Sequence, residues 1–406
     1  MSLRLLFTIA ITTLLCFCTK QNPKLVIITG KITNPKGESV SFNKKDTSYT
    51  TTTNEDGVFC ISFFLDSATY MNFEHGPEVT AMYVRPGDKI ELTIDIELFD
   101  ETIKYEGSKE SSFLAKKYLL NEENNFFGEI FYMSSLKEYK IQLDTYKISV
   151  INEFNMIKDS LFIKNELEDI EKSITNFIER QGKLLKYGLD VRTYMWKTKE
   201  LAKNYNFYSS IDSLNSFQFK ELLDDYSSEF RALLSKVHDN DFVAEAKEKI
   251  AKTTNLWIER KTAIDNMPKE GELAINFTYP DKNDNEFSLS SFKGSLVYVD
   301  VWATWCGPCR AQIPALEKLE EDYTDQNITF LSISVDTNKD AWLKMIAEKE
   351  LGGVQLWADG WSQITKDYAI FSIPRFMIFS ADGNVISTDA PRPTSEEIRG
   401  LIDANL

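Results

Sequence analysis

Two cysteines three positions apart are the residues of this chain with the clearest capacity for chemistry. Cys306 and Cys309 lie in the segment Asp-Val-Trp-Ala-Thr-Trp-Cys-Gly-Pro-Cys-Arg, residues 300–310, where an apolar strand pattern meets a helix start. Such thiols can close into a small disulfide, and the free backbone N–H groups at a helix start favour the thiolate of the first. We infer reversible dithiol chemistry. A static disulfide is the alternative, although a bridge across so short a loop stabilises a fold little.

Composition excludes several classes of function. The chain has 406 residues, 43% of them hydrophobic, which predicts two or three domains. The formal net charge of −16 argues against nucleic acid as a partner, because a polyanion would be repelled. The two histidines, His75 and His238, are far apart, and with a single Cys-x-x-Cys pair they cannot build a four-ligand zinc site. We expect no metal and no other cofactor.

The N-terminus predicts export. An apolar run, residues 5–17, follows Arg4; it is too short to cross a bilayer of about 30 Å and suits a secretion signal, which we place at residues 1–18. Its end resembles a bacterial lipoprotein signal, in which a cysteine becomes the lipidated first residue. We assign lipidation to Cys18, with Cys16 as the alternative because Phe17 is larger than the usual preceding residue. A plain cleaved signal or an uncleaved anchor is the other interpretation. The expected location is the periplasmic side of the cell envelope, lipid-anchored to the membrane.

Residues 24–106 have the pattern of a small β-sandwich-like domain. Apolar and polar residues alternate from Lys89 to Leu98, as in a strand with one face in solvent. Turn signals rich in Asn, Asp, Pro and Gly recur at residues 34–37, 54–57 and 85–88. Cys60 falls in an apolar strand pattern, where we expect a buried and inert thiol. No catalytic constellation is recognisable in this domain.

Residues 108–266 are predicted to form an all-α middle region. No proline occurs between Pro86 and Pro268. Apolar residues recur at steps of three or four, as in the series Leu143, Tyr146, Val150, Phe154, Ile157 and Leu161. The aromatic residues of this region could line a partner groove, but their helical spacing favours core packing. We assign no site to it.

Residues 272–406 have the pattern of an α/β domain. The strand Leu296–Trp302 runs into the cysteine pair, and a second apolar strand follows at residues 329–335. Alternation of strands and helices implies a mainly parallel sheet covered on both faces. An antiparallel hairpin, residues 375–379 and 384–387, is expected across an Asp-Gly turn at the sheet edge, and a final helix over residues 395–404.

This domain resembles the thioredoxin fold and, within it, the TlpA/ResA-like envelope thiol-disulfide oxidoreductases. The resemblance covers about the last third of the chain and rests on residues in the order of the family: Trp305-Cys306-Gly307-Pro308-Cys309, Pro314 and Ile373-Pro374. An added helix and strand between Lys339 and Tyr368 are typical of that branch. The whole layout, together with residues 83–88, also resembles envelope lipoproteins whose N-terminal domain has no established activity.

The resemblance implies roles for the site residues. Cys306 is expected to be the exposed nucleophile, and Cys309 the shielded thiol that resolves a mixed disulfide. Supporting positions are Trp305 beside the cysteines, Gly307 and Pro308 between them, and Pro374, expected in cis, which would shape the substrate groove.

Asp300 is the expected proton acceptor. It lies six residues before Cys306 and matches the buried carboxylate of thioredoxins, which takes the proton of the second thiol. Many TlpA/ResA-like proteins instead carry a glutamate three residues after the second cysteine, where this chain has Gln312, which cannot exchange a proton. This difference favours a general thioredoxin-like reductase over a specialised role in cytochrome maturation. A hydrogen-bonded strand residue without a catalytic role is the alternative for Asp300.

These features predict an enzyme that reduces disulfides of envelope proteins. Gly-Pro between the cysteines is the dipeptide of thioredoxin, at the reducing end of the fold's range of potentials. The electrons would come from a membrane donor that the sequence does not identify. One alternative is a partner-binding lipoprotein in which residues 24–266 recruit the partner and the redox domain is auxiliary. Another is a thiol peroxidase of the peroxiredoxin kind, whose motif Pro-x-x-x-Thr-x-x-Cys does not occur here.

Overall fold

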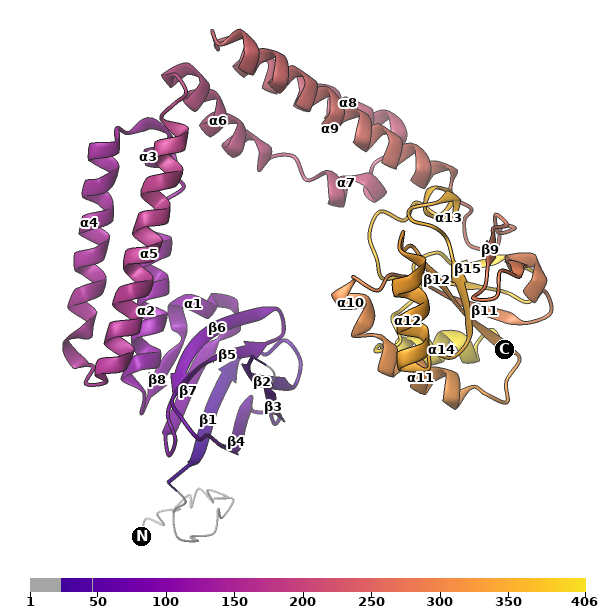
Figure 1. The fold of residues 1–406 in the computed structure, drawn as a ribbon, viewed down its shortest axis with the longest axis horizontal. Helices are drawn as coiled ribbons and strands as arrows, with labels where there is room; N and C mark the ends of the chain where they lie inside the picture. Colours follow the sequence, from indigo (N-terminus) through magenta and orange to yellow (C-terminus); the bar gives the residue numbers. More distant parts are fainter. Residues whose placement is uncertain (1–22, 46) are drawn as a thin grey trace, which may run out of the picture. The chain divides into compact units, whose positions relative to one another are not determined.

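A computed structural model describes residues 23–45 and 47–406 of the chain (Figure 1). Contacts between residues divide it into two compact units, one ending at Trp196 and the other comprising Lys197–Leu406. The division falls inside helix α6 (Leu189–Ala202), within the stretch predicted to be helical. The predicted classes are confirmed: a β-rich N-terminal region, a helical middle region and a thioredoxin-like domain at the C-terminus.

The N-terminal export signal is not tested by the structure. Both of its cysteines, Cys16 and Cys18, lie outside the described residues, so export and lipid attachment stay predictions. In residues 23–45 and 47–406, no helix has the length and apolar character needed to cross a membrane.

The N-terminal unit begins with two four-stranded sheets that share one apolar core. The strand orders are β4-β1-β7-β8 and β3-β2-β5-β6. Alternation along the strands turns apolar side chains of both sheets, such as Ile28, Phe42 and Phe73, into this core. The strands are β1 (Leu25–Thr33), β2 (Ser39–Lys44), β3 (Thr47–Thr52), β4 (Val58–Phe64), β5 (Thr69–His75), β6 (Glu78–Val84), β7 (Lys89–Asp95) and β8 (Lys104–Glu106).

Two expectations for this region are wrong in detail. Cys60 is exposed, because alternation along β4 turns Phe59 and Phe63 into the core and the cysteine to the other face. The strand expected to reach Leu98 ends at Asp95, whose carboxylate accepts the backbone N–H of Glu97 and caps a 3-10 turn, Ile96–Leu98.

Three long helices follow the strands: α2 (Lys109–Asn124), α4 (Leu136–Asn152) and α5 (Ser160–Leu184). Two short helices are α1 (Phe99–Thr102), which precedes β8, and α3 (Glu129–Met133). The apolar series from Leu143 to Leu161 does not form one helix. Helix α4 ends at Asn152, and Asp159 accepts the backbone N–H groups of Leu161 and Phe162 at 3.0 Å to start α5. Leu161 is therefore exposed, whereas Phe162 is buried.

The second unit begins with helices that precede the thioredoxin-like domain. They are α7 (Phe207–Ser213), α8 (Ser216–Leu234) and α9 (Asn240–Asn266). Helices α8 and α9 pack against each other, and apolar residues of all three, among them Phe207, Leu223 and Trp257, form their core.

A five-stranded sheet in the order β13-β12-β11-β14-β15 forms the centre of the thioredoxin-like domain. Strand β11 (Leu296–Trp302) lies in the middle; β12 (Ile328–Ser334) pairs with it in parallel and β14 (Arg375–Phe379) antiparallel. Strand β13 (Val354–Trp357) is parallel to β12, and β15 (Val385–Ser387) closes the other edge as the predicted hairpin. A separate two-stranded pair precedes the sheet: β9 (Thr278–Pro280) and β10 (Glu286–Ser288).

Helices cover both faces of this sheet. The core on one face combines Val297, Val299 and Val301 with Trp342 of α12 (Lys339–Lys349) and Ile364 of α13 (Gln363–Asp367). The core on the other face combines Tyr298 with residues of α11 (Ile313–Asp322) and α14 (Glu397–Asp403). All seven residues of β11 are buried, so it is the rigid element that leads into the cysteine pair.

Candidate active site

The cysteine pair follows the central strand directly. After β11 ends at Trp302, Cys306 caps the one-turn helix α10 (Gly307–Arg310), and Pro308 occupies its first turn. Proline suits this position because its ring presets the helical backbone angle and its missing N–H would have no helical partner. Cys306 and Cys309 are joined by a disulfide.

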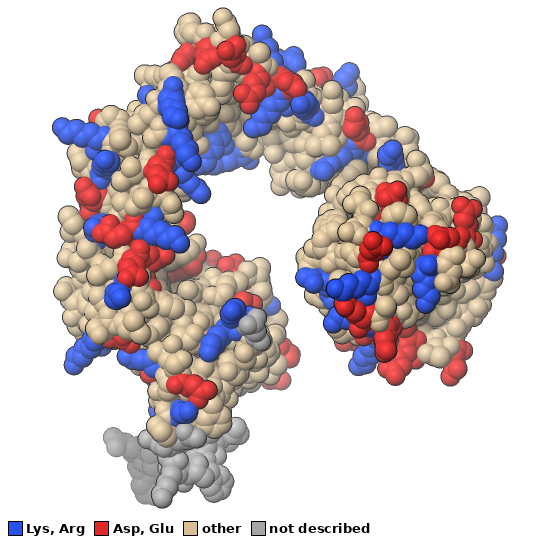
Figure 2. All heavy atoms as spheres, viewed as in Figure 1, with Lys and Arg blue, Asp and Glu red and all other residues tan. Residues whose placement is uncertain are grey.

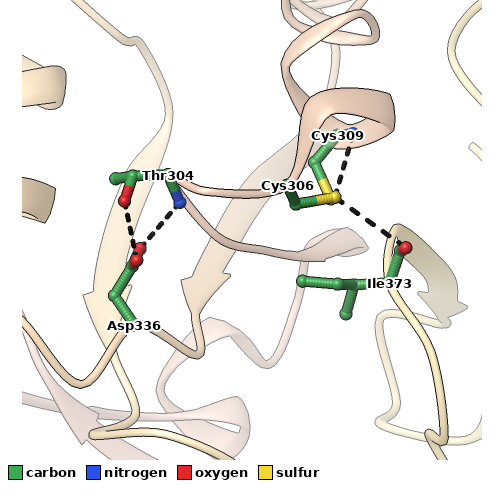
Figure 3. The surroundings of a disulfide bond; sticks show 5 residues. All are labelled: Thr304, Cys306, Cys309, Asp336 and Ile373. Atoms are coloured by element: carbon green, nitrogen blue, oxygen red, sulfur yellow. Dashed lines mark hydrogen bonds between the residues drawn. A yellow bond between two sulfur atoms is a disulfide. The ribbon is translucent and has the colours of Figure 1, made fainter. Parts of the chain in front are cut away.

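Two backbone groups surround the sulfur of Cys306 (Figure 3). The N–H of Cys309 donates to Cys306 Sγ at 3.1 Å, a contact that would stabilise a thiolate once the disulfide opens. The carbonyl oxygen of Ile373 lies 3.8 Å from the same sulfur. A disulfide sulfur carries no proton, so this second contact becomes a hydrogen bond only for the reduced thiol. The Ile373–Pro374 peptide bond is cis, and the Ile373 carbonyl oxygen is the atom of this segment that contacts the sulfur.

The expectation that Cys306 is exposed is wrong for the oxidised protein. The relative exposures are 5% for Cys306 and 4% for Cys309, and both side chains belong to the apolar core of the domain. The cause lies far away in sequence, since the Ile373 segment covers the sulfur. Trp305, next to Cys306 in the sequence, is 60% exposed.

Asp336 anchors the loop before the cysteines, and sequence reasoning missed it. Its buried carboxylate accepts the backbone N–H of Thr304 at 2.9 Å and the Thr304 hydroxyl at 2.7 Å (Figure 3). The hydroxyl of Ser334 donates to the same carboxylate at 2.7 Å. The sequence did contain a signal for Asp336, because it lies two residues after the end of β12, and the carboxyl ends of parallel strands share one edge of the sheet.

Asp300 lies in the middle of β11, opposite Ser332 of β12 and Phe376 of β14. It is 8% exposed, and its Oδ1 atom has no hydrogen-bond partner among the described residues. Burial, reinforced by the negative charge of Glu320, raises the pKa of Asp300 to about 8. No hydrogen bond of the described residues joins Asp300 to either cysteine.

Gln312 has a structural partner. Its side-chain oxygen accepts the hydroxyl of Thr394 at 3.0 Å, which ties the start of α11 to the segment before α14. The side chain is 9% exposed.

Glu320 of α11 is a second carboxyl group that sequence reasoning missed. It lines the same small cavity as Asp300, and burial, with the charge of Glu317, raises its pKa to about 7. The helical spacing could have predicted that Glu320 faces inward, because it lies between the inward-facing residues Leu316, Leu319 and Tyr323. No group of three or more His, Cys, Asp or Glu residues in the described part of the chain could hold a metal ion.

On the face seen in Figure 2, charged side chains of both signs are interspersed. Lys and Arg lie among Asp and Glu on this face. The exclusion of nucleic acid as a partner therefore still rests on the net charge of −16 and stays a prediction.

The fold and the dithiol together define a thioredoxin-like protein, and comparison with known proteins narrows the class. Residues 271–388 match the model of the AhpC/TSA family. Thiol-disulfide oxidoreductase ResA of Bacillus thuringiensis is 26% identical over 128 residues, which are 32% of this chain and 73% of that protein. Thioredoxin-like protein YneN of Bacillus subtilis is 28% identical over 145 residues, 33% of this chain and 79% of that protein.

A solved structure of a thiol-disulfide oxidoreductase from Bacteroides fragilis is 26% identical, with a TM-score of 0.31, and the match covers 33% of this chain and all of that one. The sequence matches place the C-terminal domain in the thioredoxin-like AhpC/TSA family, with homologues of the ResA type. The chain is a thiol-disulfide oxidoreductase.

Replacing Asp300 by Asn should make the protein more stable at alkaline pH. The pKa of this carboxyl is 3.8 in the unfolded chain and about 8 in the fold, so the wild-type fold loses stability as pH rises between these values. Asn cannot ionise, and we expect the variant to match the wild type near pH 4. At pH 8 its free energy of unfolding should be higher by a few kcal/mol, since a tenfold change in proton binding corresponds to about 1.4 kcal/mol.

Urea unfolding followed by tryptophan fluorescence at both pH values measures this difference. The exposed Asp325→Asn substitution is the matched control and should leave the pH dependence as it is in the wild type. An Asp300→Asn protein with the wild-type pH dependence would show that Asp300 ionises freely in the fold.

Proposed function

We propose that this oxidoreductase reduces disulfides of partner proteins in the cell envelope through Cys306 and Cys309. The observation that carries the proposal is the sulfur of Cys306, bonded to Cys309 at the end of a buried strand and held between the Cys309 N–H and the segment of cis Pro374. Gly307 and Pro308 give the loop the thioredoxin dipeptide, which supports the reducing direction. A membrane donor would return the electrons to the disulfide.

In the first step the Cys306 thiolate attacks one sulfur of a partner disulfide. A mixed disulfide forms, and the other partner sulfur leaves as a thiolate that takes a proton from solvent. The N–H of Cys309, 3.1 Å from Cys306 Sγ, favours the attacking thiolate.

In the second step Cys309 resolves the mixed disulfide. Its S–H proton passes through a water to the Asp300 carboxylate, and its sulfur attacks Cys306 Sγ. The Cys306–Cys309 bond forms, the bond to the partner breaks, and the second partner sulfur leaves. Two electrons have moved to the partner, and the enzyme carries the disulfide seen in the structure.

Replacing Cys309 by Ser should trap partner proteins on Cys306. Without the resolving thiol the mixed disulfide persists, so non-reducing gels of cells expressing the variant should show adducts that disappear on reduction. Cys60 is exposed and is changed to Ser in every variant, so that adducts form at the active site. Cys306→Ser with Cys309 retained is the control and should trap far less; equal trapping by both variants would contradict the assignment of the nucleophile.

Replacing Asp300 by Asn should slow the second step. The carboxyl must be ionised to accept a proton, and its pKa is raised to about 8, so the wild-type rate of disulfide reduction should rise as pH passes that value. We expect the variant to be about 10- to 100-fold slower there, at the low end of general-base effects because solvent can substitute. Stopped-flow fluorescence with a model protein disulfide measures the rate; a variant with wild-type rates from about pH 6 to 9 would exclude Asp300 as the base.

We also propose that the chain is anchored to the envelope membrane by lipid on Cys18. Support comes from the lipoprotein-like signal at residues 1–18. Cys18→Ser should release the protein from the membrane fraction and abolish labelling by a fatty-acid analogue, whereas Cys16→Ser should do neither. If the Cys16 variant loses the label and the Cys18 variant keeps it, the modified residue is Cys16; labelling of neither protein would refute the anchor.

A further inference from the structure

Asp300 lines a small cavity of the C-terminal domain. The cavity has a volume of about 20 Å³ and lies between helix α11 and strands β11, β12 and β13. That volume is enough for about one water molecule. Neither cysteine lines it.

The cavity wall carries polar atoms that need partners. Asp300 Oδ1, Trp302 Nε1 and Gln355 Oε1 belong to lining residues, are buried and have no hydrogen-bond partner among the described residues. A buried water needs two to four polar partners, and these atoms offer two acceptors and one donor. Asp300 itself is more than nine-tenths buried. The cavity is therefore polar enough to hold a water next to the Asp300 carboxyl.

Glu320 continues the polar path towards solvent. Its side chain lines the same cavity and is only half-buried, and Glu317, one turn earlier on α11, is exposed at the rim. The Glu320 carboxylate lies against the backbone of Gly352, where a Cβ atom would come within 2.3 Å of Glu320 Oε2. Because Gly352 has no Cβ atom, the Glu320 carboxylate can occupy this position.

Asp300, Glu317 and Glu320 are the ionisable groups that line the cavity, and no Lys, Arg or His is among the lining residues. No cation therefore holds either inner carboxyl in its ionised form. Burial raises the pKa of Asp300 to about 8 and that of Glu320 to about 7, so a proton can move between the two groups at little cost in either direction.

We propose that Glu320 and one water in this cavity carry protons between Asp300 and solvent during turnover. The route depends on the proposed function, because Asp300 receives its proton from Cys309 in the second step. The Asp300 carboxyl then gives that proton to the water, the water gives one to the Glu320 carboxylate, and Glu320 releases it to solvent. No electron moves, and the return of electrons to the disulfide uses the same path in reverse. Glu320 is a positioning and proton-relay residue that touches neither sulfur.

Glu320→Gln tests the relay, with the exposed neighbour Glu321→Gln as the matched control. We expect disulfide reduction by the Glu320→Gln protein to be about tenfold slower in dilute buffer and to be restored by rising concentrations of imidazole, which can deliver protons directly. The midpoint of the pH profile should also move down, because the charge of Glu320 raises the pKa of Asp300. The wild type and Glu321→Gln should be independent of buffer concentration.

The Gly352→Ala variant tests whether the relay needs the Glu320 carboxylate in its observed position, and not only its charge. The new Cβ would displace the Glu320 carboxylate while keeping it ionisable, and Gly352 does not have a left-handed backbone conformation. We expect disulfide reduction by the Gly352→Ala protein to depend on imidazole as it does in the Glu320→Gln protein, although the charge of Glu320 is retained.

Three outcomes overturn the relay: rates of Glu320→Gln equal to those of Glu321→Gln, a lower pH midpoint without buffer dependence, or no buffer dependence in Gly352→Ala. Failure of the proposed function looks different. In that case the wild type does not reduce protein disulfides, or Asp300→Asn is as fast as the wild type.

Discussion

A carboxyl group in the centre of a strand that is buried on both faces is the constraint on which the C-terminal domain depends. Strand β11 must be covered on both sides to hold the sheet together, yet it carries Asp300. A charge in that place would cost far more than a neutral acid, so the fold favours the protonated form. The stability of the sheet and the capacity to accept a proton near neutral pH are thus set by the same side chain.

Two other buried carboxylates in this chain, unlike Asp300, have ion-pair or hydrogen-bond partners. Glu166 in the N-terminal unit accepts the hydroxyl of Tyr70 at 2.6 Å and the ammonium group of Lys117 at 2.7 Å. Glu110 is bonded by the guanidinium group of Arg85 at 3.0 Å. These pairs satisfy the charge and link helices to the sandwich. Only at the candidate site does the described part of the chain leave a buried carboxylate oxygen without a partner, which structural need does not explain.

Local signals in the sequence were sufficient for most of the C-terminal fold. The run Leu296–Trp302, the Asp-Gly hairpin and the helix start at the cysteines each depend on neighbouring residues, and the structure contains them. Features that depend on distant contacts were not accessible. Burial of Cys306 comes from the Ile373 segment, and the placement of Asp300 and Glu320 around one cavity comes from the packing of α11 on the sheet. In the middle region, an apolar series that looked continuous is divided between two helices, because α4 ends at Asn152 and Asp159 caps the start of α5.

The hydrogen bonds between Thr304 and Asp336 affect how the Cys306–Cys309 disulfide can open. The backbone entering the loop is tied to a buried carboxylate, and the loop leaves through a helical turn, so both ends of the dithiol segment are held. Breaking the sulfur–sulfur bond then requires little rearrangement of the main chain. When the bond opens, the local change that these anchors leave free is at the two sulfur atoms, which separate and gain protons. The direction of electron flow then depends on the potential of this dithiol relative to those of its electron donor and its partner proteins.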